Sequence, residues 1–117
     1  MNSYIPNIAL FHVEQAIKDN VTISSGSNKL YNDGSTSRYF EVPAVSNYTP
    51  IGIVGYYIDP NPSDGDGHDA SLAVVYRLEL IDTADTNVVS GKLIGASIHA
   101  TAACKFKFCV NVLYIRN

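Results

Sequence analysis

The stretch of the chain richest in potential ligands is segment 59–70, DPNPSDGDGHDA. Its carboxylates Asp64, Asp66 and Asp69 are closely spaced, and hard cations such as Ca²⁺ bind clustered carboxylate oxygens. The pattern does not match an EF-hand loop. Counting from Asp64, the glycine position holds Asp69 and the bidentate glutamate position holds Val75. Proline, glycine, aspartate and serine also favour turns. A loose calcium site and a solvated loop tip both stay open, and we expect no bound metal and no cofactor.

The same segment suits recognition without a metal. Polar connections that project from a rigid sheet scaffold often carry recognition residues, and aspartate and histidine can hydrogen-bond to sugar hydroxyls. Tyr56 and Tyr57 are neighbours on a predicted strand and face opposite ways, so one is expected in the core and the other at the surface, where its ring can stack on a sugar. The predicted recognition residues are Tyr56, Tyr57, Asp64, Asp66, His68 and Asp69.

The remaining polar residues predict no catalytic site. There is no nucleophile-elbow motif, and Glu41 and Glu79 are expected on solvated strand faces rather than across a cleft. His12, His68 and His99 lack the spacing of zinc ligands. If copies of the chain assembled around a threefold axis, an axial His12 or His99 would occur three times, which leaves ion binding on such an axis open. We expect a protein that is not an enzyme.

The composition narrows the possible partners. The 117 residues are 46% hydrophobic and only 16% charged, with a formal net charge of -3. Because there is no basic stripe, nucleic acid is not an expected partner. No apolar run is long enough for a membrane span, and the N-terminus does not resemble a signal peptide. We expect no membrane insertion.

The two cysteines are separated by five positions in one predicted strand. Cys104 and Cys109 therefore point to opposite faces, which argues against a disulfide between them. We expect both as buried free thiols, in agreement with synthesis in a reducing compartment.

The elements that would position these residues are strands. Apolar alternation and β-branched content predict strands at 20–24, 38–45, 50–59, 71–82, 88–100 and 104–116. Residues 7–20 fit either a strand or one face of a helix, and the strand is favoured. The segment between the first two strands, 25–37, is rich in glycine, serine and asparagine and predicts a long loop or broken hairpin.

Two of these strands make specific predictions about faces. In 71–82, alternation places Leu72, Val74, Tyr76, Leu78 and Leu80 on one side, opposite Val75, Arg77, Glu79 and Ile81. In 104–116, one face is wholly apolar, while the other begins with Lys105 and Lys107 and ends with Leu113 and Ile115. We expect the second face of 104–116 to be covered towards its end. The fold class is therefore all-β, an antiparallel β-sandwich or jelly-roll-like single domain.

Three stretches carry a resemblance to a known family: YTPIGIVGYYI at 48–58, VVYRLEL at 74–80 and KFKFCVNVLYIRN at 105–117. With these stretches the chain resembles the C-terminal head domains of bacteriophage tail-fibre or receptor-binding proteins of siphophages and prophages. The resemblance covers about residues 20–117, so 1–19 is assigned as an N-terminal lead-in, a strand or shaft remnant, and 20–117 as the head. Such heads usually end a long fibre, so we expect this chain to be either an excised fragment of one or an unusually short protein.

The resemblance implies an all-β homotrimer in the virion tail, made in the bacterial cytoplasm, that adheres to a host-surface glycan or protein, often a saccharide. Small residues would then allow close packing between subunits: Gly91, Gly95, Ala96, Ser97, Ala100, Ala102 and Ala103. Two alternatives stay open. One is a structural virion protein of the baseplate, decoration or trimerisation type without a receptor. The other is a monomeric carbohydrate-binding module, against which the absence of tryptophan counts.

Overall fold

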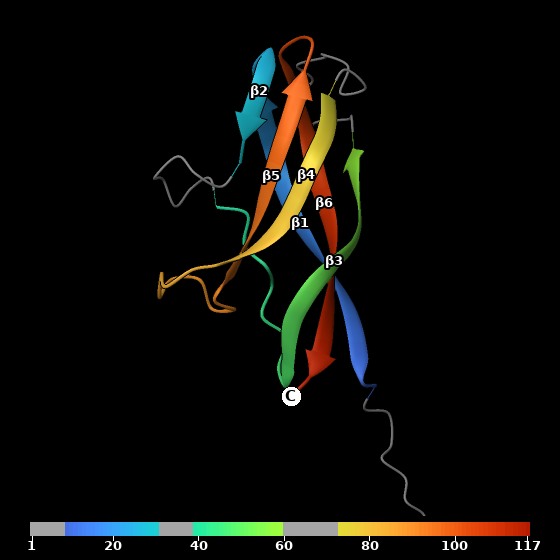
Figure 1. Ribbon diagram of the computed structural model, residues 1–117, viewed down its shortest axis with the longest axis vertical. Coiled ribbons are helices and arrows are strands. Elements are labelled where there is room, and N and C mark those ends of the chain that lie inside the picture. The colour runs from blue at the N-terminus through green and yellow to red at the C-terminus, as the bar shows by residue number, and fades with distance from the viewer. Residues whose placement is uncertain (1–8, 31–38, 60–72) are drawn as a thin grey trace, which may run out of the picture.

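The structure is a computed structural model that describes residues 9–30, 39–59 and 73–117 (Figure 1). These residues form two antiparallel sheets of three strands each. Sheet A has the order β1-β6-β3 and contains β1 (Phe11–Ile23), β6 (Cys104–Arg116) and β3 (Tyr48–Asp59). Sheet B has the order β2-β5-β4 and contains β2 (Gly26–Lys29), β5 (Lys92–Ala100) and β4 (Ala73–Asp82).

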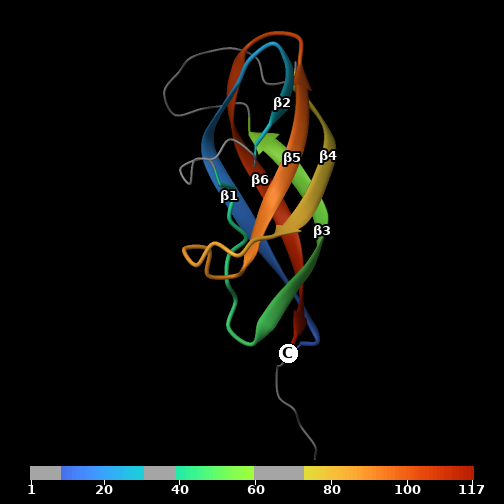
Figure 2. The same ribbon diagram turned by 60° about the vertical axis from the view of Figure 1, so that its left-hand side comes forward.

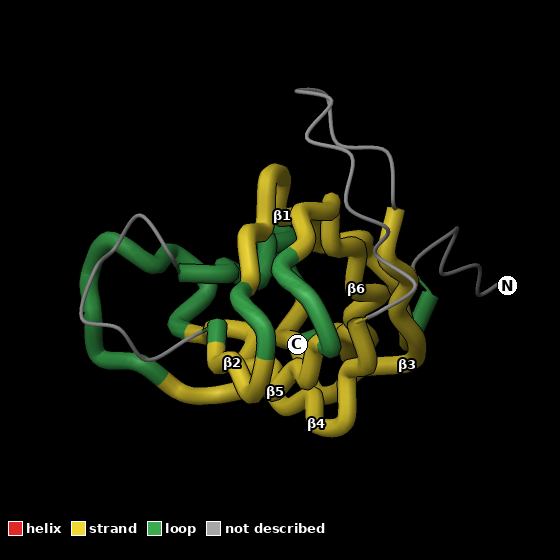
Figure 3. Tube along the Cα trace, turned by 90° about the horizontal axis from the view of Figure 1, so that it is seen from above, coloured by secondary structure: helices red, strands yellow, loops and turns green. Residues whose placement is uncertain are grey.

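The two sheets pack face to face and form two layers, seen from the side and from above (Figures 2 and 3). One hydrophobic core lies between them. Strand β6 supplies the fully buried Phe106, Phe108 and Val110, and β5 supplies Ile94 and Ile98 from the opposite layer. The predicted all-β antiparallel sandwich is confirmed. A jelly roll has about eight strands, and the described residues form six, so that finer expectation stays a prediction. Among the residues described, no helix is long and apolar enough to cross a membrane.

Most predicted strands are present, with shifted bounds. The favoured strand at 7–20 and the one predicted at 20–24 are a single strand, β1. It crosses the expected boundary between the lead-in (1–19) and the head (20–117) and pairs with β6 on both sides of that boundary. The predicted strand 38–45 is wrong. Only Glu41 forms a bridge there, to Leu93, because the chain runs beside β5 for a few residues and then leaves it. Strand β5 starts later than expected because turns precede it, ending at Gly91, whose φ of 71° favours glycine.

The alternation predicted for 71–82 is broken by a bulge. The register with β5 shifts between Val75 and Arg77, so Tyr76 is an extra residue on β4. As a result Val75 faces the core together with Leu78, although the pattern had put them on opposite sides. Tyr76 is 58% exposed rather than buried with the leucines.

Four of the small residues expected at a subunit contact are instead buried within the chain: Gly95, Ala96, Ser97 and Ala100. Ala96 and Ala100 are buried in the core between the sheets, where small side chains let β5 pack closely against sheet A. Gly95 and Ser97 are also buried. For Gly91, Ala102 and Ala103, which are at least partly exposed, a subunit contact stays a prediction.

The two ends of the sandwich differ in what they carry. At one end, which we call the loop end, β3 finishes at Asp59, β4 starts at Ala73 and β5 finishes at Ala100. The opposite end, which we call the terminal end, holds the start of β1 and the C-terminus, with Arg116 N–H donating to the Leu10 carbonyl at 2.8 Å. Sheet A extends further toward the terminal end than sheet B does (Figure 1).

Candidate functional site

Four of the six predicted receptor-binding residues, Asp64, Asp66, His68 and Asp69, lie outside the described residues. The described strands nevertheless fix where their segment is attached. It leaves β3 after Asp59 and joins β4 shortly before Ala73, and both strand ends lie at the loop end of the sandwich (Figure 1). Any contact made by this segment therefore starts from the end of the molecule opposite the C-terminus.

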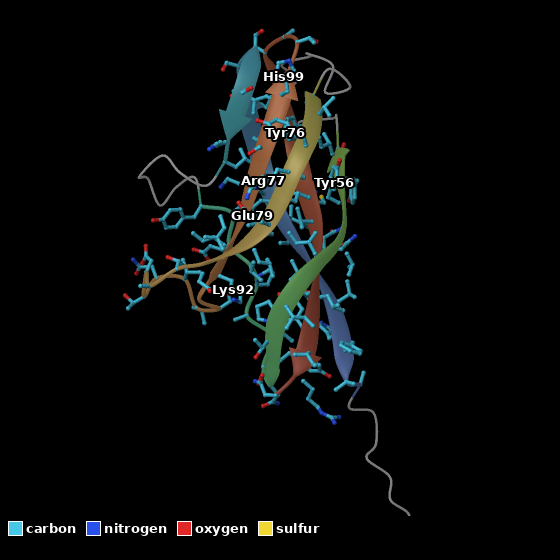
Figure 4. All side chains as sticks on the ribbon, in the orientation of Figure 1. Tyr56, Tyr76, Arg77, Glu79, Lys92 and His99 are labelled. Atoms are coloured by element: carbon cyan, nitrogen blue, oxygen red, sulfur yellow. The ribbon has the colours of Figure 1, made fainter. Side chains whose placement is uncertain are left out.

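Tyr56 is placed at the open edge of the sandwich by β3, which is an edge strand of sheet A. Its ring meets core residue Phe108 edge-to-face, with the ring centroids 5.9 Å apart, yet 45% of Tyr56 stays exposed (Figure 4). One part of the ring therefore packs on the core while the rest is available to a ligand. Because a tyrosine side chain is amphipathic, Tyr56 can pack on the core and contact a ligand at the same time.

Tyr57 points to the outer face of sheet A, opposite to Tyr56. It pairs in register with Cys109 of β6, and the thiol is fully buried while Tyr57 is 50% exposed. Hydrogen bonding to Cys109, and then the charge of Cys109, raise the pKa of the Tyr57 hydroxyl above 10.0, whereas a hydrogen bond with Gln15 of β1 lowers it. Tyr57 thus lies across β6 toward β1. Both cysteines are free and buried, and only Cys104 belongs to the core between the sheets.

The outer face of sheet B carries a polar group of side chains. Arg77 and Glu79 alternate onto this face from β4, and their Nη2 and Oε2 atoms form an ion pair at 3.2 Å (Figure 4). His99 of β5 lies on the same face closer to the loop end, opposite Val74 in the register. The bulge adds Tyr76 beside Arg77. The arrangement offers guanidinium donors, carboxylate acceptors and an exposed aromatic ring, which together can bind a hydroxyl-rich ligand.

Sequence reasoning missed this group as a site. Glu79 was expected on a solvated face, while Tyr76 was expected on the face that carries Leu78 and Leu80. Tyr76 faces outward because of the bulge, and no glycine or proline in VVYRLEL indicates a bulge in the sequence. Lys92, at the other end of β5, forms a separate ion pair with Asp82 (Figure 4).

His12 belongs to a second polar group, at the terminal end. Its Nε2 atom hydrogen-bonds to Glu14 Oε1 at 2.9 Å, and its ring lies 5.4 Å from that of Tyr48 and 5.9 Å from that of Tyr114. The Tyr48 hydroxyl donates to the Ala9 carbonyl. The Tyr114 hydroxyl donates to the Pro43 carbonyl. Burial, and then the charge of Glu14, raise the pKa of Tyr114 to about 12.

These contacts give the second group a structural role. Its hydroxyls and imidazole are engaged with one another and with the backbone, so it joins β1, β3 and β6 at the terminal end. In the described part of the chain, no group of three or more histidine, cysteine, aspartate and glutamate side chains could hold a metal ion.

Comparisons with known proteins give no relative from which a role could be transferred: no protein-family model, curated protein or solved structure matches the chain.

Proposed function

We propose that the chain is the head domain of a bacteriophage tail fibre or receptor-binding protein, which adheres without catalysis to a saccharide on the bacterial surface. The observation that supports this most is that the two ends of the sandwich differ: both described chain ends lie at one of them, and exposed candidate contact residues lie toward the other. The chain's described start at Ala9 and its C-terminus lie at the terminal end, while Tyr56, Tyr76 and His99 lie toward the loop end (Figure 4).

Contacts to the sugar come from the outer face of sheet B and the adjoining loop end. Arg77 and Glu79 exchange hydrogen bonds with neighbouring hydroxyls, and the exposed ring of Tyr76 packs on the apolar face of a sugar ring. The segment 60–72 contributes Asp64, Asp66, His68 and Asp69 as further contacts. In a homotrimer three such weak sites act together, and avidity raises the overall affinity without any new contact.

The test is binding to purified bacterial cell-wall polysaccharides and lipopolysaccharide O-chains immobilised on a sensor surface. We expect the chain to bind at least one of them. Tyr76→Ala and Arg77→Ala should each weaken that binding by about tenfold or more, an effect of about 1.4 kcal/mol per site. The matched control is Val89→Ala, since Val89 is 85% exposed on the turn between β4 and β5, away from the proposed contacts.

Two results would contradict this proposal. One is a chain that assembles but binds none of the polysaccharides or O-chains, which would favour a structural virion protein. The other is Tyr76→Ala and Arg77→Ala variants that bind as tightly as Val89→Ala, which would remove the outer face of sheet B from the receptor site.

A further inference from the structure

Strand β1 turns its apolar side outward over its first half. Phe11, Val13 and Ile17 point away from the core and are 50%, 52% and 48% exposed. The alternate positions, on the inner side of sheet A, include the polar His12 and Glu14. A one-residue shift in register would exchange the two sets, and a strand with only one covered face should bury its apolar set. This exposure suggests that the outer face of sheet A is covered in the functional protein.

The neighbouring strands continue this apolar surface. The register places Leu113 and Ile115 of β6 beside Val13 and Phe11. On the other side of β6, two bulges in β3 add the exposed residues Ile51 and Val54. We call this surface the outer apolar face, made up of Phe11, Val13, Gln15, Ile17, Ile51, Gly52, Val54, Gly55, Tyr57, Asn111, Leu113 and Ile115.

The charge distribution on the outer side of sheet A resembles that of a protein–protein interface. None of the residues of the outer apolar face is charged. Toward the loop end the same side of the sheet becomes polar, where Lys107 pairs in register with Asp59. An apolar centre with a charged rim is the usual anatomy of a protein–protein interface, and monomeric proteins rarely expose contiguous apolar patches larger than a few hundred Å².

The area is also of the right order. Three strands, the longest of 13 residues, give a sheet face of roughly 43 by 14 Å, or about 600 Å² in projection. A corrugated surface has a larger accessible area than its projection. A stable interface buries about 800 Å² on each partner. The outer apolar face covers only the Phe11–Ile17 part of β1, so an interface of this size must also include the charged rim toward the loop end.

We propose that copies of this chain associate through the outer apolar face of sheet A. This inference rests on the proposed homotrimer and names the surface that forms it. The occupant is another copy, because three such uncharged sheet faces can converge on the axis of the proposed homotrimer. The polar centre of each face consists of Gln15 and Asn111, two amides that each donate and accept hydrogen bonds, and no charge on the face selects a partner of opposite sign.

The amide pair sets the register between copies. Gln15 lies opposite Asn111 in the ladder between β1 and β6, in the middle of the apolar positions. Gln15 hydrogen-bonds to Tyr57 within the chain, but burying the remaining donors and acceptors of the two amides without partners would be costly, so copies must align them with polar groups of a neighbour. Tyr57, which reaches toward Gln15, lies within the same face. The outer face of sheet B stays free in the assembly.

Gly52 allows a clean test of this interface. It sits on the outer side of β3 opposite Leu113, and a Cβ atom built there meets nothing within 4 Å. Gly52→Lys therefore leaves the folded chain intact but places a long charged side chain in the path of a second copy. The control is Val74→Lys, because Val74 is 59% exposed on the outer face of sheet B. Val13→Lys is a second interface variant, at a position 52% exposed.

The measurement is the native mass by light scattering after size exclusion, with circular dichroism to confirm folding. We expect the unaltered chain and Val74→Lys at three times 12.7 kDa. Gly52→Lys and Val13→Lys should fall to a single chain with an unchanged β spectrum. If both folded interface variants keep the mass of the unaltered chain, the interface lies elsewhere and the inference is overturned, while polysaccharide binding still decides the proposed function. An unaltered chain that is monomeric at all concentrations overturns the inference directly.

Discussion

Gln15 of β1 and Asn111 of β6 lie directly opposite each other in the antiparallel ladder, and their amides point out of sheet A amid apolar neighbours. Because they point out of sheet A, the two amides do not contribute to the core between the sheets. Their position is explained if another copy covers the face, because buried polar groups that must find partners restrict how two surfaces align.

A charge at this position should make assembly depend on pH. Gln15→Glu keeps the shape of the side chain but brings three carboxylates close together in the proposed homotrimer. Near neutral pH their repulsion and desolvation should dissociate the assembly, whereas near pH 4, close to the ordinary glutamate pKa of about 4.3, protonation should restore it. Native mass across this range is the measurement. Ser27→Glu, an exposed substitution on sheet B, is the control and should stay assembled throughout.

Tyr114 should make the fold sensitive to alkaline pH. Burial and the charge of Glu14 raise its pKa from 10.0 to about 12, so the folded state holds the phenol proton more tightly than the unfolded state does. The stabilisation is complete below pH 10 and is lost as pH rises toward 12. Urea unfolding at several pH values should show this decline. In Tyr114→Phe the decline between pH 10 and 12 should be smaller, and an equal decline would assign the effect to other groups.

Phe108 is the aromatic centre of the core. Its ring lies 5.6 Å from that of Phe40 and 6.1 Å from that of Phe106, besides the contact with Tyr56. Phe108→Ala should lower the free energy of unfolding by about 3–5 kcal/mol, because it leaves a cavity between the sheets. Urea denaturation measures this change. Val54→Ala, on the outer face of sheet A, should cost the isolated chain far less, and equal losses would place the core elsewhere.

The segment 60–72 should contribute to receptor binding without calcium. Replacing Asp64, Asp66 and Asp69 together by asparagine should weaken binding to the polysaccharide that the unaltered chain recognises. A chelator should leave that binding and the native mass unchanged. A loss of binding on chelation, reversed by added Ca²⁺, would establish the calcium site that the clustered carboxylates leave open.

The sequence predicted those parts of the fold in which local pattern and burial agree. Strand β6 alternates as expected because it is the central strand of sheet A, and its apolar face is buried along its whole length in the core. The strand preference for 7–20 is confirmed by β1. Tyr56 and Tyr57 face opposite ways, as adjacent strand residues must.

The failures share a physical cause. The extra residue at Tyr76 shifts the pleat of β4, and local alternation carries no information about such a shift. Ala96 and Ala100 look like residues for a close subunit contact, but a small side chain is equally suited to a tight contact between two sheets. The polar group formed by Arg77, Glu79 and His99 joins two strands and depends on their register, which one-dimensional pattern does not give.

The measurement that tests the account most directly is sedimentation equilibrium of the unaltered chain over a hundredfold range of concentration. A trimeric head predicts one species at three times 12.7 kDa, with dissociation only at the lowest concentrations. A single 12.7 kDa species across the whole range would contradict both the homotrimer and the interface on sheet A, and would favour a monomeric carbohydrate-binding module.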